Sequence, residues 1–458
     1  MTTGAARPCC TRPLCWPGSR KRPVLQASPD QQFFPLATYR VGAYASSGVQ
    51  VWAGMIDYLR YINEVEGGIN GVKLVWQECE TEWTAEKGIE CYERFKNGLD
   101  GAPVAVYQPN GAPAAYALSE RAEVDKIPLI TLGYGRTEAT DGTVFPYNFP
   151  VMLTFYSEAS TLVNYIAQRE GGFDKLKGKK IATVYHDSAY GRETLGPLKL
   201  LAEKYGFENI QIPVADPGNE QAGQWRQIRQ LKPDWVFLRT WGVSTPVAIK
   251  TAARFGFPVE RIVGDIWASS NEDVLPAAEA GKGYLALTPY PGGSNFDIHQ
   301  RIKEHILDKG KSDLKDPKSF GSVYYNSGLV NAAIAVEAIR AGQKKFGNRP
   351  LNGEEGRWGL EHLDLGDAVQ IAHGEGGVAH AGLDRTGVQF QGPAESGGDL
   401  EECFALVQPS HALVIVDLAG KRRVGVEQDF RAVFQLHALA LADHGQVVGL
   451  QAHGQVAE

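Results

Sequence analysis

Six short segments of the chain combine the residue types that bind a small polar molecule. Each follows a short apolar run and holds glycines, small hydroxyl side chains, aromatic rings or one or two acids. Backbone N–H groups of a glycine-rich loop can bind a carboxylate, an acid can bind an ammonium group, and Tyr or Trp can wall an apolar side chain. The segments are Ala43–Gly48, Gln108–Ala115, Gly133–Thr137, His186–Gly191, Thr240–Thr245 and Asp265–Asp273.

The motifs of common enzymes are absent from the sequence. There is no P-loop, HExxH or GxSxG motif, and no CxxC pair or zinc-type Cys/His spacing. The segment Gly133–Glu138 begins like a dinucleotide fingerprint but lacks its third glycine. His186 and Asp187 adjoin at a strand end with no Ser or Cys nucleophile placed near them, so we interpret His186 as a polar rim residue. We predict a protein that is not an enzyme and has no cofactor and no metal site.

The six segments belong to residues 31–365, where short β-rich runs alternate with helical patterns. This alternation predicts parallel sheets covered by helices, and near-continuous apolar runs are typical of strands buried on both faces. Ligands bind such sheets at the carboxyl ends of the strands. One such loop is typical of an ordinary turn, but six at one sheet edge predict a pocket. The expected strands are 34–41, 73–78, 103–107, 127–132, 180–185, 210–214, 234–239, 261–265 and 284–288, and the expected helices are 51–65, 85–96, 155–169, 192–205, 220–231, 246–255 and 322–345.

Length and charge narrow the class of protein further. A chain of 458 residues predicts two or three domains. The net charge of −7 argues against a nucleic-acid partner, and no run of about 18 apolar residues predicts a transmembrane helix. A plan of helix, Gly-Gly turn, Lys and strand occurs at residues 67–74 and again at 171–185, so a second lobe is expected to start near Pro150.

Two of the six cysteines lie close enough in the sequence to close a small disulfide loop. Cys79 and Cys91 enclose a segment that we expect to contain a strand end, a turn and a helix. In an exported protein they could form a disulfide, since disulfides persist only in oxidising compartments. The alternative is a pair of buried free thiols.

The two ends of the chain differ from the middle. Residues 1–30 hold five basic residues and no apolar stretch of the roughly 7–15 residues that a signal peptide needs, so we expect a disordered or aberrant segment. Residues 366–458 have no Trp or Tyr and contain six of the ten histidines. A shifted reading frame, a fusion or a His-rich metal-binding tail would each account for this composition. We expect this tail to be poorly ordered, although the apolar run Ala412–Leu418 could form a strand.

Residues 31–365 resemble the periplasmic substrate-binding proteins of branched-chain amino-acid-type ABC transporters. The order and spacing of seven segments carry the resemblance, and together they are far more specific than any one alone. They are Tyr39–Gly48, Ile62–Leu74, Glu78–Phe95, Asp125–Tyr147, Lys177–Glu193, Gln224–Gly242 and Arg357–Leu365. The resemblance implies the type I periplasmic-binding fold, which is α/β, with two doubly wound parallel-sheet lobes joined by a hinge of three crossover segments. Lobe 1 is expected from residues 31–150 and 288–345, and lobe 2 from 151–287 and 346–365.

The resemblance also implies roles for individual residues. The loops after the third and fourth strands bind the ligand carboxylate in this family, and they match Asn110–Ala112 and Gly133–Gly135 here. An acid after the eighth strand binds the ammonium group, for which Asp265 and Glu272 compete, while Tyr190 matches a ligand-facing aromatic. The predicted ligand-binding residues are Ser47, Asn110, Gly111, Ala112, Gly133, Tyr134, Gly135, Tyr190, Trp241, Asp265, Trp267, Glu272 and Tyr290.

The function implied is that of the solute-binding component of an ABC importer. Such a protein captures an amino acid or a related small carboxylate or amide between its lobes and delivers it to a membrane permease with its ATPase. Gly111 and Ala112 stand where relatives often carry Ser or Thr, and the many aromatics suit an aromatic acid or amide as well as leucine. A two-lobed sensory or regulatory protein that responds to amides or amino acids is the alternative. The resemblance implies a periplasmic location, although the chain has no recognisable signal peptide.

Overall fold

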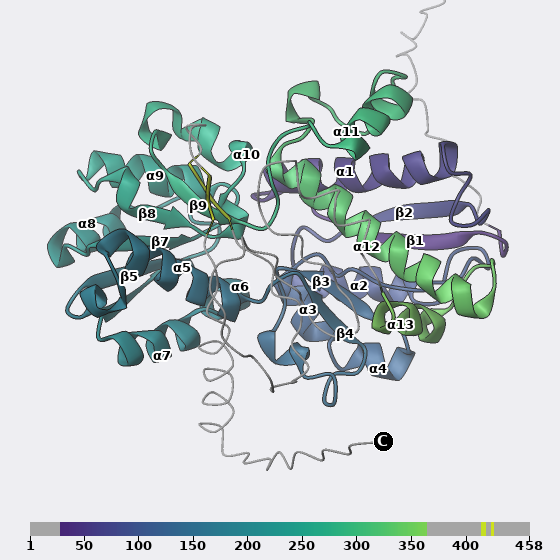
Figure 1. The fold of residues 1–458 in the computed structure, drawn as a ribbon, viewed down its shortest axis with the longest axis horizontal. Coiled ribbons are helices and arrows are strands. Elements are labelled where there is room, and N and C mark those ends of the chain that lie inside the picture. The colour runs from purple at the N-terminus through teal and green to yellow at the C-terminus, as the bar shows by residue number, and fades with distance from the viewer. Residues whose placement is uncertain (1–27, 364–413, 418–422, 426–458) are drawn as a thin grey trace, which may run out of the picture.

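A computed structural model describes residues 28–363, 414–417 and 423–425. These residues form two lobes side by side, each built on β-strands that are mainly parallel and are covered by helices (Figure 1). The predicted α/β fold class with two doubly wound lobes is confirmed. No helix in this described part of the chain is long and apolar enough to cross a membrane.

Lobe 1 carries the first strands of the chain. They are β1 (Gln32–Thr38), β2 (Leu74–Glu80), β3 (Leu129–Leu132) and β4 (Asn148–Val151), with β1 parallel to β2 and β3 parallel to β4. The expected strand 103–107 is reduced to isolated bridges, Phe33–Val104 and Tyr107–Leu129, which connect the two pairs. β4 was not predicted, because it contains Pro150 and proline usually argues against a strand that is not at an edge.

The helices of lobe 1 come from both halves of the chain. They are α1 (Ala45–Glu64), α2 (Ala85–Phe95), α3 (Ala112–Leu118), α4 (Arg121–Asp125), α11 (Asp297–Ile302), α12 (Val323–Phe346) and α13 (Gly353–Glu361). α12 lies along α1 (Figure 1), so a segment more than 250 residues later in the chain completes the lobe that the N-terminal strands begin.

The prediction that residues 346–365 belong to lobe 2 is wrong for helix α13, which lies within this range. Helix α13 packs on α12 and against lobe 1 loops: a Cβ on Gly353 would lie 1.9 Å from the carbonyl oxygen of Lys126, and one on Gly356 would lie 2.0 Å from that of Ala105. Only glycine permits backbones to approach so closely. The sequence pattern of α13 identifies a helix but carries no information about which lobe it covers.

Lobe 2 contains a seven-stranded sheet in the order β11-β10-β9-β8-β7-β5-β6. The strands are β5 (Lys180–His186), β6 (Glu208–Val214), β7 (Trp235–Arg239), β8 (Ile262–Gly264), β9 (Leu285–Thr288), β10 (Val414–Asp417) and β11 (Arg423–Gly425). β5 to β9 are parallel, whereas β10 is antiparallel to β9 and β11. β10 confirms the strand expected within Ala412–Leu418. The expectations for residues 1–27 and for the rest of the tail lie outside the described residues.

Helices cover the lobe 2 sheet between these strands. They are α5 (Phe155–Glu170), α6 (Ala189–Arg192), α7 (Leu195–Tyr205), α8 (Ala222–Leu231), α9 (Ser244–Arg254) and α10 (Asn271–Val274). Local sequence signals mark their ends. For example, Thr154 and Ser157 form a capping box at the start of α5, and Gly171 ends that helix in the left-handed conformation, with φ of +95°.

Two described segments connect the lobes, residues 152–154 between β4 and α5 and residues 289–296 between β9 and α11. The third crossover that the resemblance implied lies outside the described residues. Residues 155–288, from α5 to β9, make up lobe 2 together with β10 and β11, and α12 places 323–346 on lobe 1.

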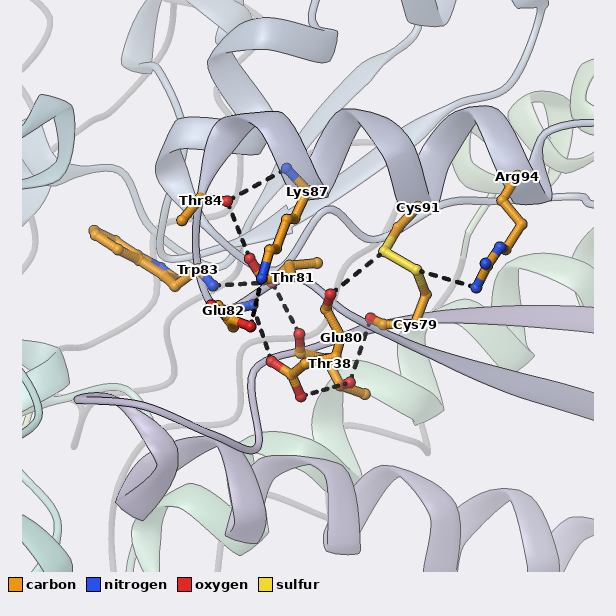
Figure 2. The surroundings of a disulfide bond; sticks show 10 residues. All are labelled: Thr38, Cys79, Glu80, Thr81, Glu82, Trp83, Thr84, Lys87, Cys91 and Arg94. Carbon is orange, nitrogen blue, oxygen red and sulfur yellow. Dashed lines mark hydrogen bonds and ion pairs between the residues drawn. A yellow bond between two sulfur atoms is a disulfide. The ribbon is translucent and has the colours of Figure 1, made fainter.

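Cys79 and Cys91 form a disulfide, which decides between the two alternatives that the sequence left open. Their Cα atoms are 5.7 Å apart, within the range that a disulfide can span. The bond ties the end of β2 to the middle of α2 and encloses the turn between them (Figure 2).

Candidate ligand-binding site

A pocket with an empty space of about 390 Å³, its opening to solvent included, lies between the lobes. Lobe 2 contributes three aromatic side chains and lobe 1 contributes the rest of the wall. The lining residues are Tyr39, Val51, Trp83, Asn110, Gly111, Ala112, Tyr134 and Asn331 from lobe 1, and Tyr190, Trp241 and Trp267 from lobe 2. Most of them follow the carboxyl end of a strand, where open α/β sheets bind ligands.

Trp241, which follows β7, joins the aromatic side chains of the two lobes. Its ring stacks on Tyr44 with centroids 4.3 Å apart and an interplanar angle of 12°. Edge contacts join it to Trp83 at 4.8 Å and to Tyr39 at 5.2 Å. Its Nε1–H donates a hydrogen bond of 3.0 Å to the hydroxyl of Ser47 on α1. Trp241 therefore presents a fixed aromatic surface to the pocket.

Hydrogen bonds also hold the lobe 1 loops that face the pocket. The backbone N–H of Asn110 donates to the Tyr134 hydroxyl at 2.9 Å, and the Asn110 side chain donates to the Gln108 carbonyl at 2.8 Å. The indole N–H of Trp267 donates to the carbonyl of Gly133 at 3.2 Å, from lobe 2 to lobe 1. Gly133 has φ of +71°, in the left-handed region that favours glycine.

A buried ionic network lies directly behind Tyr190. The Arg239 guanidinium contacts both Glu158 and Asp265, at 3.1 Å from the latter, and all three side chains are fully buried. Arg239 also donates to the carbonyl of Tyr190 at 2.7 Å, and the Tyr190 hydroxyl donates to Asp265. Burial away from water, with the Glu158 carboxylate nearby, raises the pKa of Asp265 well above its usual range.

Further contacts join the lobes beside the pocket. The Tyr44 hydroxyl of lobe 1 lies 2.8 Å from Nε2 of His186, which lies 3.1 Å from the Asp216 carboxylate. The backbone N–H of Thr137 donates to the Glu193 carboxylate at 2.7 Å. Burial lowers the pKa of His186, so its ring is neutral near pH 7. The lobes therefore meet through polar contacts as well as through aromatic rings.

The structure brings together seven of the predicted site residues in the pocket wall: Asn110, Gly111, Ala112, Tyr134, Tyr190, Trp241 and Trp267. Ser47 and Gly133 lie one layer behind, as hydrogen-bond partners of Trp241 and Trp267. The others lie outside the wall: Gly135 lies against Thr131, Tyr290 is buried, Asp265 lies behind Tyr190, and the Glu272 carboxylate accepts a hydrogen bond from Ser270.

Four residues of the wall were missed by the sequence analysis. Tyr39 and Trp83 follow β1 and β2, so the rule that located the other loops would have found them. Val51 and Asn331 lie on the helices α1 and α12, where no local signal distinguishes a pocket residue from a core residue.

The model of the family described as periplasmic binding protein matches residues 32–360 of the chain. The chain belongs to this family. Its similarity to solved periplasmic binding proteins and related structures extends over most of its length. A search of curated proteins found no match.

A crystal structure described as an ABC transporter permease from the Pseudomonas fluorescens group is 73% identical. The match covers 93% of this chain and 100% of that one, with a TM-score of 0.76. A branched-chain amino acid ABC transporter protein from Thermus thermophilus with bound valine is 19% identical, covers 90% and 99% of the two chains, and has a TM-score of 0.68. A solute-binding protein from R. palustris in complex with benzoate is 17% identical, covers 87% and 96%, and has a TM-score of 0.61. The last two likenesses show the fold alone.

Proposed function

We propose that this protein is the solute-binding component of an ABC importer. It captures a small carboxylate or amide between its lobes in the periplasm and delivers it to a membrane permease with its ATPase. The observation that carries the proposal is the pocket between the lobes, whose aromatic walls come from both of them. A molecule held there contacts Tyr134 of lobe 1 and Trp241 of lobe 2 at once.

Binding acts by shifting a conformational equilibrium and involves no chemical change in the solute. The lobes exchange between separated and closed arrangements, and a ligand that contacts both stabilises the closed one. Separation breaks the hydrogen bonds from Trp241 to Ser47 and from Trp267 to Gly133. A ligand in the pocket adds contacts that exist only when the lobes are together, and these contacts offset the entropy that closure loses.

The chemistry of the wall favours an aromatic acid or amide over an α-amino acid, because backbone N–H groups of Gly111 and Ala112, where α3 begins, can bind a carboxylate or amide oxygen, whereas no lining group can pair with an ammonium group. None of the eleven lining residues carries a carboxylate. The Asp265 carboxylate, behind the wall, already pairs with Arg239 and accepts a hydrogen bond from Tyr190. A buried ammonium group would lack a counter-charge, which costs several kcal/mol. Within the described residues the buried Oδ1 of Asn331 has no hydrogen-bond partner, so it is available to a neutral N–H or O–H donor of a ligand.

A thermal-shift screen tests this function. The compounds are L-valine, L-leucine, L-phenylalanine, urea, benzoate and benzamide, with calorimetric titration of those that raise the midpoint. A ligand at 100 times its Kd stabilises the folded protein by about 2.7 kcal/mol through linkage. We expect benzoate or benzamide to raise the midpoint more than the amino acids do. Stabilisation by the amino acids alone would contradict the ligand class, and stabilisation by none of the compounds would contradict the proposed function.

A further inference from the structure

Among the described residues of lobe 1, Trp83 has the most ring contacts across the pocket. Its ring centroid lies 4.8 Å from that of Trp241, 5.8 Å from that of His186 and 6.3 Å from that of Tyr190, all three in lobe 2. It also contacts Tyr44 of its own lobe at 4.9 Å. The ring is only partly buried, and it lines the pocket. Trp83 therefore belongs both to the pocket wall and to the contact between the lobes.

The backbone at this position has an unusual conformation. Glu82 has φ of +47° and Trp83 has φ of +61°, in the left-handed region that bulky side chains seldom adopt. Two such residues in succession persist only where the surrounding structure holds them, and conformations of this kind concentrate at functional sites. A glycine would adopt this turn without strain. The chain instead has a large aromatic side chain here, directed at the pocket.

The disulfide and a threonine hold the turn in place (Figure 2). Cys79 lies in β2 before the turn and Cys91 lies in α2 after it, so their bond fixes both ends of the turn relative to each other. The Thr81 hydroxyl accepts the backbone N–H of Trp83 at 3.1 Å and donates to the carbonyl of Thr38 in β1 at 2.8 Å. Trp83 is thereby tied to the central strands of lobe 1.

Three further features complete this support. The Thr84 side chain accepts the backbone N–H of Lys87 at 3.3 Å and caps α2, while the Lys87 ammonium pairs with the Glu82 carboxylate (Figure 2). On the other side, a Cβ on Gly111 would lie 3.0 Å from the indole of Trp83. The absence of a side chain at Gly111 leaves the space that the indole occupies.

We propose that Trp83 is a specificity-determining residue of the binding site. It is the ring of lobe 1 against which a bound aromatic solute and the rings of lobe 2 pack. The Cys79–Cys91 disulfide and Thr81 are its positioning residues, and they act on affinity only through the indole. The inference rests on the proposed function, because it assigns a role within the same pocket.

Calorimetric titrations with benzoate and with benzamide test the role of the ring. The proteins are the wild type, Trp83→Ala and Trp83→Phe, with Trp358→Ala as the control. Trp358 is also a partly buried tryptophan of lobe 1, and it lies on α13 outside the pocket. We expect Trp83→Ala to weaken binding about 10- to 100-fold, Trp83→Phe to weaken it less, and Trp358→Ala to leave it unchanged. An affinity of Trp83→Ala within about twofold of the wild type would overturn the proposal.

A double-mutant cycle tests the positioning role of the disulfide. The paired change Cys79→Ser and Cys91→Ser is made in the wild type and in Trp83→Ala. We expect it to weaken binding in the first background and to have no further effect in the second, since the positioned ring is already absent there. If the paired cysteine change weakened binding by the same factor in both backgrounds, the positioning role would be overturned.

A second variant pair keeps this test decisive if removal of the disulfide prevents folding. Thr81→Val removes the hydroxyl that holds Trp83, and Thr81→Ser keeps it. We expect Thr81→Val to weaken binding only while the indole of Trp83 is present, and Thr81→Ser to restore the affinity. Equal affinities of the valine and serine variants would contradict the positioning role of Thr81.

Small-angle scattering separates the failure of this inference from the failure of the proposed function. If the wild type binds neither benzoate, benzamide nor any other compound of the screen, the proposed function fails. The contacts of Trp83 with lobe 2 still predict that ligand-free Trp83→Ala has a larger radius of gyration than both the wild type and Trp358→Ala. Equal radii in that case would overturn the role of Trp83 as well.

Discussion

Replacement of Arg239 by methionine tests the buried network behind Tyr190. Arg239 is the one cation that contacts the carboxyl groups of Glu158 and Asp265 within the described residues. Methionine keeps most of the length and apolar volume of the side chain but removes the charge and the donors. The two carboxyl groups then lose the cation that they share, and the carbonyl of Tyr190 loses the Arg239 donor, in a site without exposed surface.

The structure sets the size of the expected effect. All three ionic side chains have no exposed surface, and removal of one partner from such a buried pair costs about 3–5 kcal/mol. The guanidinium also lies over the rings of Phe155 at 4.0 Å and Tyr190 at 4.4 Å, and these contacts are lost too. We therefore expect Arg239→Met to lower the free energy of unfolding by at least about 3 kcal/mol at pH 7.

The loss should depend on pH in a defined direction. Burial raises the pKa values of Glu158 and Asp265 in the folded protein. Carboxyls with raised pKa values stabilise the folded state below their unfolded pKa values, and this stability is lost as the pH rises through the folded ones. Without Arg239 the ionised carboxylates of Glu158 and Asp265 are still less favourable in the folded protein. The free energy of unfolding of Arg239→Met should therefore fall short of the wild-type value by less at pH 5 than at pH 7.

Urea unfolding followed by circular dichroism at both pH values measures these differences. Arg261→Met is the matched control, because Arg261 also pairs with a lobe 2 glutamate, Glu170, but 43% of its side chain is exposed. Such a pair contributes about 1 kcal/mol or less, and Lys179 remains to hold Glu170. If Arg239→Met were no less stable than Arg261→Met at pH 7, the buried network would not have the role assigned to it.

Three further predictions concern binding and stability. Tyr190→Ala and Trp241→Ala should each weaken benzoate or benzamide binding by roughly 1–3 kcal/mol, the loss expected for a buried aromatic; unchanged affinity in calorimetry for both would remove the site assignment. Hydrogen bonding to Lys179 lowers the pKa of Glu170 to about 2, so its stabilisation is present above pH 4.5 and is lost as the pH falls toward 2. The stability gap between the wild type and Glu170→Gln should therefore close between pH 4.5 and 2 in urea titrations, and a gap independent of pH would speak against the ion pair. Loss of the Cys79–Cys91 disulfide should lower the free energy of unfolding by about 3 kcal/mol, as expected for a closed loop of this length; a variant that matches the wild type in urea would refute this figure.

Strands buried on both faces were the part of the fold that the sequence predicted best. Continuous apolar runs identified β5 and β7, and the structure places each within one residue of its expected bounds. Strand β4 was not found because it contains Pro150, and residues 103–107 align with their neighbours with only isolated pairing. The lobe that α13 covers depends on close backbone contacts with Ala105 and Lys126, which are distant in sequence.

The expected carboxyl ends of the strands predicted most residues of the pocket wall. Parallel strands end at one edge, so Asn110, Tyr134, Tyr190 and Trp241 come together although they are far apart in the chain. Two features depend on tertiary packing instead. Asn331 lines the pocket from α12. The carboxylate of Asp265, which the sequence analysis assigned to a ligand ammonium group, instead pairs with Arg239 on the neighbouring strand β7.

A crystal structure of the protein in complex with benzoate or benzamide, whichever of the two binds more tightly, tests the central claim most directly. The claim is that a small solute is held between the lobes by aromatic side chains from both. We predict one molecule in contact with Trp83 of lobe 1 and with Tyr190 and Trp241 of lobe 2. A molecule bound to one lobe alone, or outside this pocket, would contradict it.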